Sequence, residues 1–194
     1  MGLNAKQWGA ILIATLFGLS FIGYIGIGGG PDAQAASTVS SDSTIEYNGF
    51  SFTQVDGYWA TDYNNQVLYF VNPPTALESF ETPNNAAEII TNSKVYIGYD
   101  PNQEIDLSSL QSRAYSFFSY FNIQSYLACT HEENCPDIPI IDCSEDHAII
   151  FLQDTETTII KAEENCLELH ALNTDTMQRQ LERILYSTLG IMEW

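Results

Sequence analysis

Four cysteines and three histidines are the residues of this chain whose side chains are suited to metal binding or thiol chemistry. They are Cys129, Cys135, Cys143 and Cys166, together with His131, His147 and His170. Structural zinc sites usually place paired ligands two to four residues apart, and thiol oxidoreductases use C-x-x-C. The cysteines are too widely spaced for either pattern, although the histidines could still lend nitrogens to a zinc ion. An even number of cysteines is typical of disulfides in a domain outside the cytoplasm, so we predict two disulfides and no metal or cofactor.

The pairing of the cysteines is left open by their spacing, because four cysteines allow three connectivities. We favour Cys129–Cys135 and Cys143–Cys166. The first bond would close a short loop over residues 130–134, and the second would tie the segment before a predicted strand to the strand around Cys166. Each bond is expected to contribute about 2–4 kcal/mol to stability.

No catalytic pattern occurs in the sequence. The chain lacks G-x-S-x-G, H-E-x-x-H, the P-loop and a G-x-G-x-x-G between a strand and a helix. His147 lies close to Cys143 and Glu145, but a disulfide-bonded sulfur cannot act as a nucleophile. The acidic run 142–146 lacks the glycine and the closing glutamate of a calcium loop. We therefore predict no catalytic residue.

The charge balance excludes nucleic acid as a partner. Six Lys and Arg stand against 25 Asp and Glu, which leaves a formal net charge of −19. A field of that sign repels phosphate backbones. The charge instead favours solubility in a salty or crowded exterior, where self-repulsion is screened.

An uncharged apolar run covers residues 8–27. A helix needs roughly 20 such residues to cross about 30 Å of hydrocarbon, so we predict a transmembrane signal anchor in the cell membrane. Lys6 precedes the run, which places the tip 1–7 in the cytoplasm by the positive-inside rule. The alternative is a signal peptide cleaved after Ala35, because Ala33-Gln34-Ala35 is a small-residue site, and the domain would then be secreted. Residues 28–43 predict a flexible linker and residues 44–194 an acidic extracytoplasmic domain.

The exported part begins with runs of aromatic and β-branched residues that predict four strands. The runs cover residues 44–47, 50–55, 58–63 and 66–71. Asn48-Gly49, Asp56-Gly57 and Asn64-Asn65 separate them, and such residues tolerate the positive φ angles of tight hairpins. Proline after residue 72 ends the last run. We predict a four-stranded antiparallel meander.

The rest of the domain mixes strands with helices. Strands are predicted over 94–99, 123–128, 148–152, 157–160 and 166–169, and helices over 86–90, after Asp106 and from Thr174 or Asp175 to Gly190. In the last helix, Asp175 and Gln178 form a capping box, and the apolar stripe leaves Arg179, Glu182 and Arg183 on the opposite side. Strands first and a mixture afterwards predict an α+β fold with a C-terminal amphipathic helix, rather than a regular doubly wound sheet.

The chain resembles a group of small archaeal single-pass membrane proteins with no assigned activity. The resemblance is carried by the apolar N-terminal segment, the stretch from Cys135 to Cys143, Asn165-Cys166, and the tail residues 183–186 and 189–192. It spans the chain loosely and implies an archaeal origin, with no catalytic residue.

Three functions are consistent with these features. The leading hypothesis is a membrane-tethered domain without enzymatic activity that binds another envelope protein or joins a membrane complex. A pilin-like filament subunit also joins an apolar helix to a β-rich head, but Lys6-Gln7-Trp8-Gly9 fits a pilin processing site poorly. An exported hydrolase using carboxylates would need a pocket lined by acids with a raised pKa.

Overall fold

The computed structural model describes residues 43–194. The predicted transmembrane helix 8–27 and the predicted tip 1–7 lie outside these residues, as does the predicted linker 28–43 except for Ser43. Among residues 43–194 no helix has both the length and the apolar character needed to cross a bilayer. The architecture below is that of the predicted exported domain, 44–194.

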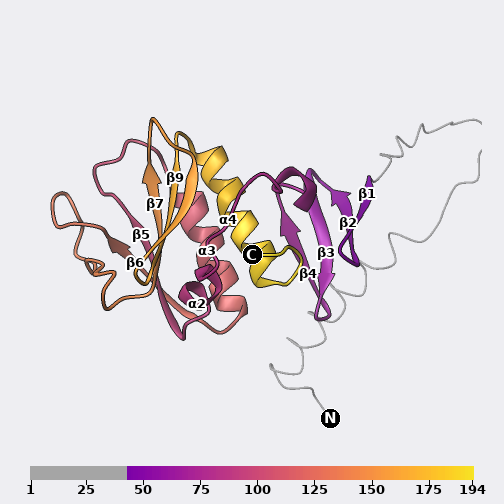
Figure 1. The fold of residues 1–194 in the computed structure, drawn as a ribbon, viewed down its shortest axis with the longest axis horizontal. Coiled ribbons are helices and arrows are strands. Elements are labelled where there is room, and N and C mark those ends of the chain that lie inside the picture. The colour runs from indigo at the N-terminus through magenta and orange to yellow at the C-terminus, as the bar shows by residue number, and fades with distance from the viewer. Residues whose placement is uncertain (1–42) are drawn as a thin grey trace, which may run out of the picture. The chain divides into compact units, whose positions relative to one another are not determined.

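The predicted meander is confirmed as an antiparallel sheet in the order β1-β2-β3-β4 (Figure 1). Its strands are β1 (Thr44–Tyr47), β2 (Phe50–Val55), β3 (Tyr58–Tyr63) and β4 (Gln66–Phe70). All three hairpins turn through two residues with positive φ, at 48–49, 56–57 and 64–65. The local turn chemistry therefore sets the register of the whole sheet.

A five-stranded mixed sheet follows, in the order β6-β5-β7-β9-β8. Its strands are β5 (Lys94–Tyr99), β6 (Gln124–Cys129), β7 (Ala148–Gln153), β8 (Ile159–Glu163) and β9 (Cys166–Ala171). Strands β6, β5, β7 and β9 are parallel, and only β8 pairs antiparallel, with β9. The α+β class is confirmed, but the sequence did not predict that four neighbouring strands run parallel.

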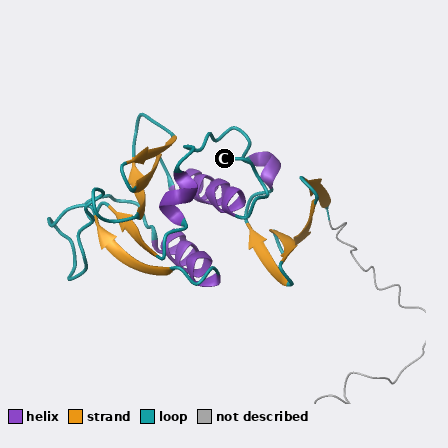
Figure 2. Ribbon diagram, turned by 60° about the horizontal axis from the view of Figure 1, so that its bottom comes forward, coloured by secondary structure: helices purple, strands orange, loops and turns teal. Residues whose placement is uncertain are grey.

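Helices fill the space between the two sheets (Figures 1 and 2). They are η1 (Pro74–Ala76), α2 (Ala86–Ile90), α3 (Ser108–Tyr120) and α4 (Thr174–Thr188). Tyr186 of α4 packs against the meander, with its ring 4.1 Å from the ring of Phe70 and 5.7 Å from that of Phe52 between centroids. Apolar residues of both sheets and all three α-helices form one continuous core around α4.

The ends of α4 agree with the prediction except for the cap. The helix begins at Thr174, but Asn173 is the N-cap, and its side chain accepts a hydrogen bond from the Thr176 amide at 2.9 Å. The predicted capping box of Asp175 and Gln178 is wrong, because Gln178 donates to Glu182 instead. Gly190 follows the helix with φ +71, as a C-terminal glycine should.

The predicted solvent face of α4 is also wrong. Glu182 is 0% exposed and Arg183 is 8% exposed. The segment that joins the two sheets crosses this face of the helix: Arg179 donates to the Ala76 carbonyl at 3.0 Å, and Arg183 donates to the Phe80 carbonyl at 3.0 Å. A buried charge is tolerated only where it is hydrogen-bonded, and here main-chain groups of the connector supply the partners.

Both favoured disulfides are confirmed. Cys129 pairs with Cys135 and Cys143 pairs with Cys166, with Cα atoms 6.1 Å and 5.3 Å apart. The loop 130–147 carries one cysteine of each bond, and its Ile141 and Cys143 pack on the face of the five-stranded sheet away from the helices. There Ile141 lies so close to Gly98 that a Cβ at Gly98 would collide with it. The bonds thus hold a cover over a parallel sheet, which needs both faces shielded from water.

A change in alkaline stability is expected from Tyr186. The ring is fully buried and its hydroxyl donates to the Asn72 carbonyl at 2.8 Å. Burial first, and the charge of Glu182 second, raise the pKa of Tyr186 above its usual value of 10.0. The unfolded chain therefore ionises first, and the stability is complete below about pH 10 and falls as the pH rises further. Urea unfolding of the full chain in detergent, at several values between about pH 9 and 11, measures this effect. The free energy of unfolding should fall less steeply with pH for Tyr186→Phe than for the unmodified chain. Parallel slopes for the two proteins would contradict this assignment.

Candidate functional site at an open strand edge

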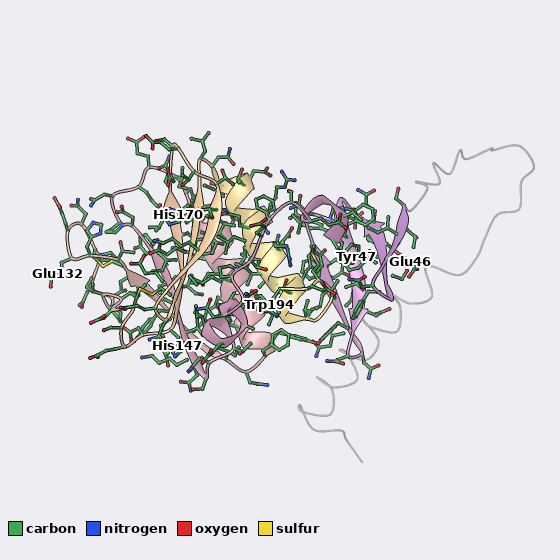
Figure 3. The ribbon with its side chains drawn as sticks, viewed as in Figure 1. Glu46, Tyr47, Glu132, His147, His170 and Trp194 are labelled. Carbon is green, nitrogen blue, oxygen red and sulfur yellow. A yellow bond between two sulfur atoms is a disulfide. The ribbon has the colours of Figure 1, made fainter. Side chains whose placement is uncertain are left out.

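The four cysteines form the two favoured disulfides, and the histidines do not gather with them into one site. Among residues 43–194 no cysteine is free. His147 and His170 lie in separate places (Figure 3). His170 sits between Glu168, at 2.8 Å, and Asp154, at 3.4 Å, whereas His131 contacts Asn102 at 2.7 Å. Within residues 43–194, no group of three or more His, Cys, Asp or Glu side chains could hold a metal ion.

A hydrolase that uses carboxylates would need an acid with a raised pKa. Where a carboxyl pKa departs from its usual value, at Asp106, Asp142, Asp154 and Glu163, it is lowered. The strongest case is Asp154, whose pKa falls to about 2 because the Thr157 hydroxyl and the amides of Glu156 and Thr157 donate to it. These contacts organise turns and favour the ionised form.

A groove of about 630 Å³ lies between β4 and α3. Every residue of β4 lines it, from Gln66 to Phe70, and Leu185 of α4 contributes as well. Side chains of a strand alternate between its two faces, so a groove lined by all five consecutive residues opens onto the edge of the strand. β4 is the last strand of its sheet, and its edge borders this groove.

Two residues of β4 present backbone groups at that edge. Tyr63 and Gln66 close a two-residue hairpin and so exchange ladder hydrogen bonds, as do Thr61 with Leu68 and Trp59 with Phe70. The alternation leaves the amide and carbonyl groups of Val67 and Tyr69 pointing away from β3. Among residues 43–194 these four groups have no hydrogen-bond partner. A partner strand could pair with them directly.

The next outward amides are already satisfied. The buried carboxylate of Glu182 accepts from the Val71 amide at 2.7 Å and from the Asn72 amide at 2.9 Å. At the other end, β4 begins directly after the turn at 64–65. The open edge of β4 therefore consists of Val67 and Tyr69, between the hairpin turn and the amides that Glu182 holds.

The opposite wall of the groove is a stripe of small polar residues on α3. Ser109, Ser112 and Ser116 are three and four residues apart, are exposed, and line the groove beside Arg113 and Tyr120. The Arg113 guanidinium lies 3.5 Å from Glu182 and is partly exposed. No carboxylate lines the groove, although the chain has 25 acidic residues. The groove therefore lacks acidic side chains and holds one cation, Arg113, in a strongly acidic chain.

Edge strands usually carry protection against pairing, such as charge, proline or a bulge. β1 has Glu46, which points away at the far edge of the meander (Figure 3), and β8 has Lys161 and Glu163. The end of β6 is bridged by Ile140 at Cys129. β4 has none of these devices, and its outer side chains Val67 and Tyr69 are 49% and 55% exposed. Such an edge is suited to receive another strand.

The sequence predicts a strand over 66–71, one residue longer than β4, but it does not reveal the groove. The available signal was the run Gln66-Val-Leu-Tyr-Phe70, which is uncharged and ends a meander in a very acidic chain. Neither the position of β4 at the sheet edge nor the approach of α3 is visible in that run. Comparison of the chain with family models, curated proteins and solved structures found no match.

Proposed function

We propose that this chain is an extracytoplasmic protein-interaction domain without enzymatic activity, tethered to the bilayer through residues 8–27, which binds an extended segment of another envelope protein in the groove between β4 and α3. The observation that carries the proposal is the unpaired edge at Val67 and Tyr69 inside a groove that no carboxylate lines. The two disulfides support an oxidising compartment outside the cytoplasm. The apolar run 8–27 supports the tether.

Proline variants separate this edge from the rest of the sheet. Val67→Pro removes an outward amide without removing a bond of the β3–β4 ladder. Glu46→Pro is the matched control, because Glu46 is likewise an outward residue, on the opposite edge of the same sheet. Both variants should keep the fold, with equal circular dichroism and unfolding midpoints, and only Val67→Pro should block pairing at the groove.

A photo-crosslinking amino acid at Ser112, in the full chain in membranes of the source organism, tests the proposal. We expect one dominant crosslinked protein, with a yield about tenfold lower in Val67→Pro and unchanged in Glu46→Pro, since the variant loses a hydrogen bond and places a ring at the edge. The captured protein is then purified and must bind the full chain, with an affinity that Val67→Pro lowers and Glu46→Pro leaves unchanged. A product that survives Val67→Pro, or no product at Ser112, contradicts the proposal.

A further inference from the structure

We infer, on the basis of the proposed function, that the groove accepts an uncharged strand rich in β-branched residues whose two flanks carry Lys or Arg. The inference names the chemistry of the partner segment. It follows from three features of the groove: the spacing of its open backbone groups, its lack of carboxylates, and the acidic residues that surround it.

The backbone requires an extended segment. The outward groups of Val67 and Tyr69 are two residues apart on one edge, which is the repeat of a strand that adds to a sheet. The Glu182 bonds to Val71 and Asn72 at one end and the hairpin turn at 64–65 at the other limit pairing to about the length of β4. The serine stripe on α3 is small, so bulky β-branched side chains of the added strand have room beside it.

The centre of the segment should be uncharged. The lining holds no carboxylate that could pair with a cation of the partner. Its single cation, Arg113, faces Glu182, whose carboxylate already accepts bonds from Val71, Asn72 and Gln178. A charge buried in this channel without a partner would be costly, so neutral residues are favoured there.

The flanks of the segment should be basic. Asp62 of β3 is exposed and directly opposite Val67 of β4, and Asp56 lies with Tyr69 and Arg113 around an adjoining hollow. Beyond them the whole chain carries a formal charge of −19. That field attracts a cationic segment and repels a second copy of the same chain, so charge complementarity selects a basic partner.

Two synthetic decapeptides test this inference against the full chain in neutral detergent, read by fluorescence anisotropy. Their sequences are KKTVTVTVKK and EETVTVTVEE. We expect the lysine peptide to bind about tenfold tighter or more at ~0.05 M salt, with the difference shrinking at ~0.5 M because screening weakens exposed charges. N-methylation of its six core amides, or Val67→Pro in the protein, should weaken binding by about tenfold, whereas Glu46→Pro should not.

The outcomes distinguish this inference from the proposed function. Equal binding of the two peptides, or tighter binding of the glutamate peptide, would contradict the inference that the flanks of the segment are basic. Absence of binding by either peptide, with a Ser112 crosslink to a partner protein that still depends on Val67, overturns the inferred segment and leaves the proposed function standing. A Ser112 crosslink that joins two copies of this chain overturns the inference in favour of self-pairing through β4.

Discussion

Glu182→Ala is expected to lower the free energy of unfolding by about 3–5 kcal/mol, the usual effect of breaking a buried, hydrogen-bonded charge network. The Glu182 side chain is fully buried and accepts from the amides of Val71 and Asn72 at 2.7 and 2.9 Å, and from the side chains of Asn72 and Gln178 at 2.8 and 2.9 Å. Alanine leaves these partly buried donors without their acceptor, and a fully buried unpaired group costs about 1–3 kcal/mol.

Urea unfolding of the full chain in detergent, followed by tryptophan fluorescence, measures this loss. Glu182→Gln should be less destabilised than the alanine variant, because one carbonyl oxygen can still accept. Glu163→Ala is the control, since Glu163 is an exposed carboxylate paired with Lys161 on the outer strand β8, and no measurable change is expected. An unfolding midpoint for Glu182→Ala equal to that of the unmodified chain would show that the carboxylate does not hold the connector in place.

Glu182 also links stability to the groove. Its carboxylate occupies the Val71 amide, which is the next outward donor after Tyr69. Without that acceptor the open edge of β4 is longer by one donor. The same side chain therefore anchors the connector between the sheets and sets one limit of the proposed binding edge.

Removal of the Cys143–Cys166 disulfide is expected to lower the free energy of unfolding by about 3 kcal/mol, and removal of Cys129–Cys135 by about 2 kcal/mol. Both values come from the chain-entropy relation for the loop that each bond closes. The bonds join residues 23 and 6 positions apart, so the first restricts the unfolded chain more. Cys143 also packs with Ile141 and Ala148 against the sheet face, so its release loosens the cover of that face.

Paired alanine variants, Cys143→Ala with Cys166→Ala and Cys129→Ala with Cys135→Ala, test this order by urea unfolding in detergent. The variant with Cys129→Ala and Cys135→Ala should keep the Ser112 crosslink under conditions where it is folded. The disulfide loop lies on the sheet face away from the helices, whereas β4 lies on the other side of the helices (Figure 1). A larger loss for the shorter loop would show that native contacts, rather than the entropy of the unfolded chain, dominate the contribution of these bonds.

Local features of the sequence predicted elements of the fold well. Asn48-Gly49 and Asp56-Gly57 adopt the positive φ angles that they favour, and the strands around them begin and end as expected. The strand over 94–99 and the short helix over 86–90 also have their predicted bounds. Such features depend on the conformational preferences of a few neighbouring residues, which the sequence states directly.

The candidate site could not be predicted in this way. An apolar stripe shows which face of α4 meets the core, but it cannot show that residues 71–80 cross the other face and bury Glu182 and Arg183 there. Likewise, the run Gln66–Phe70 reads as a strand, whereas its place at the edge and the approach of α3 follow from contacts across the whole domain.

By itself, the sequence determined the meander with its turns, the acidic charge and the two-disulfide count, because these depend on composition and on preferences within a few residues. Only the tertiary structure decided the parallel order of the second sheet, the burial of Glu182 and the groove beside β4. The physical reason is distance along the chain: Glu182 meets Val71 across 111 positions. Such a contact forms only when burial of the shared core brings the two segments together.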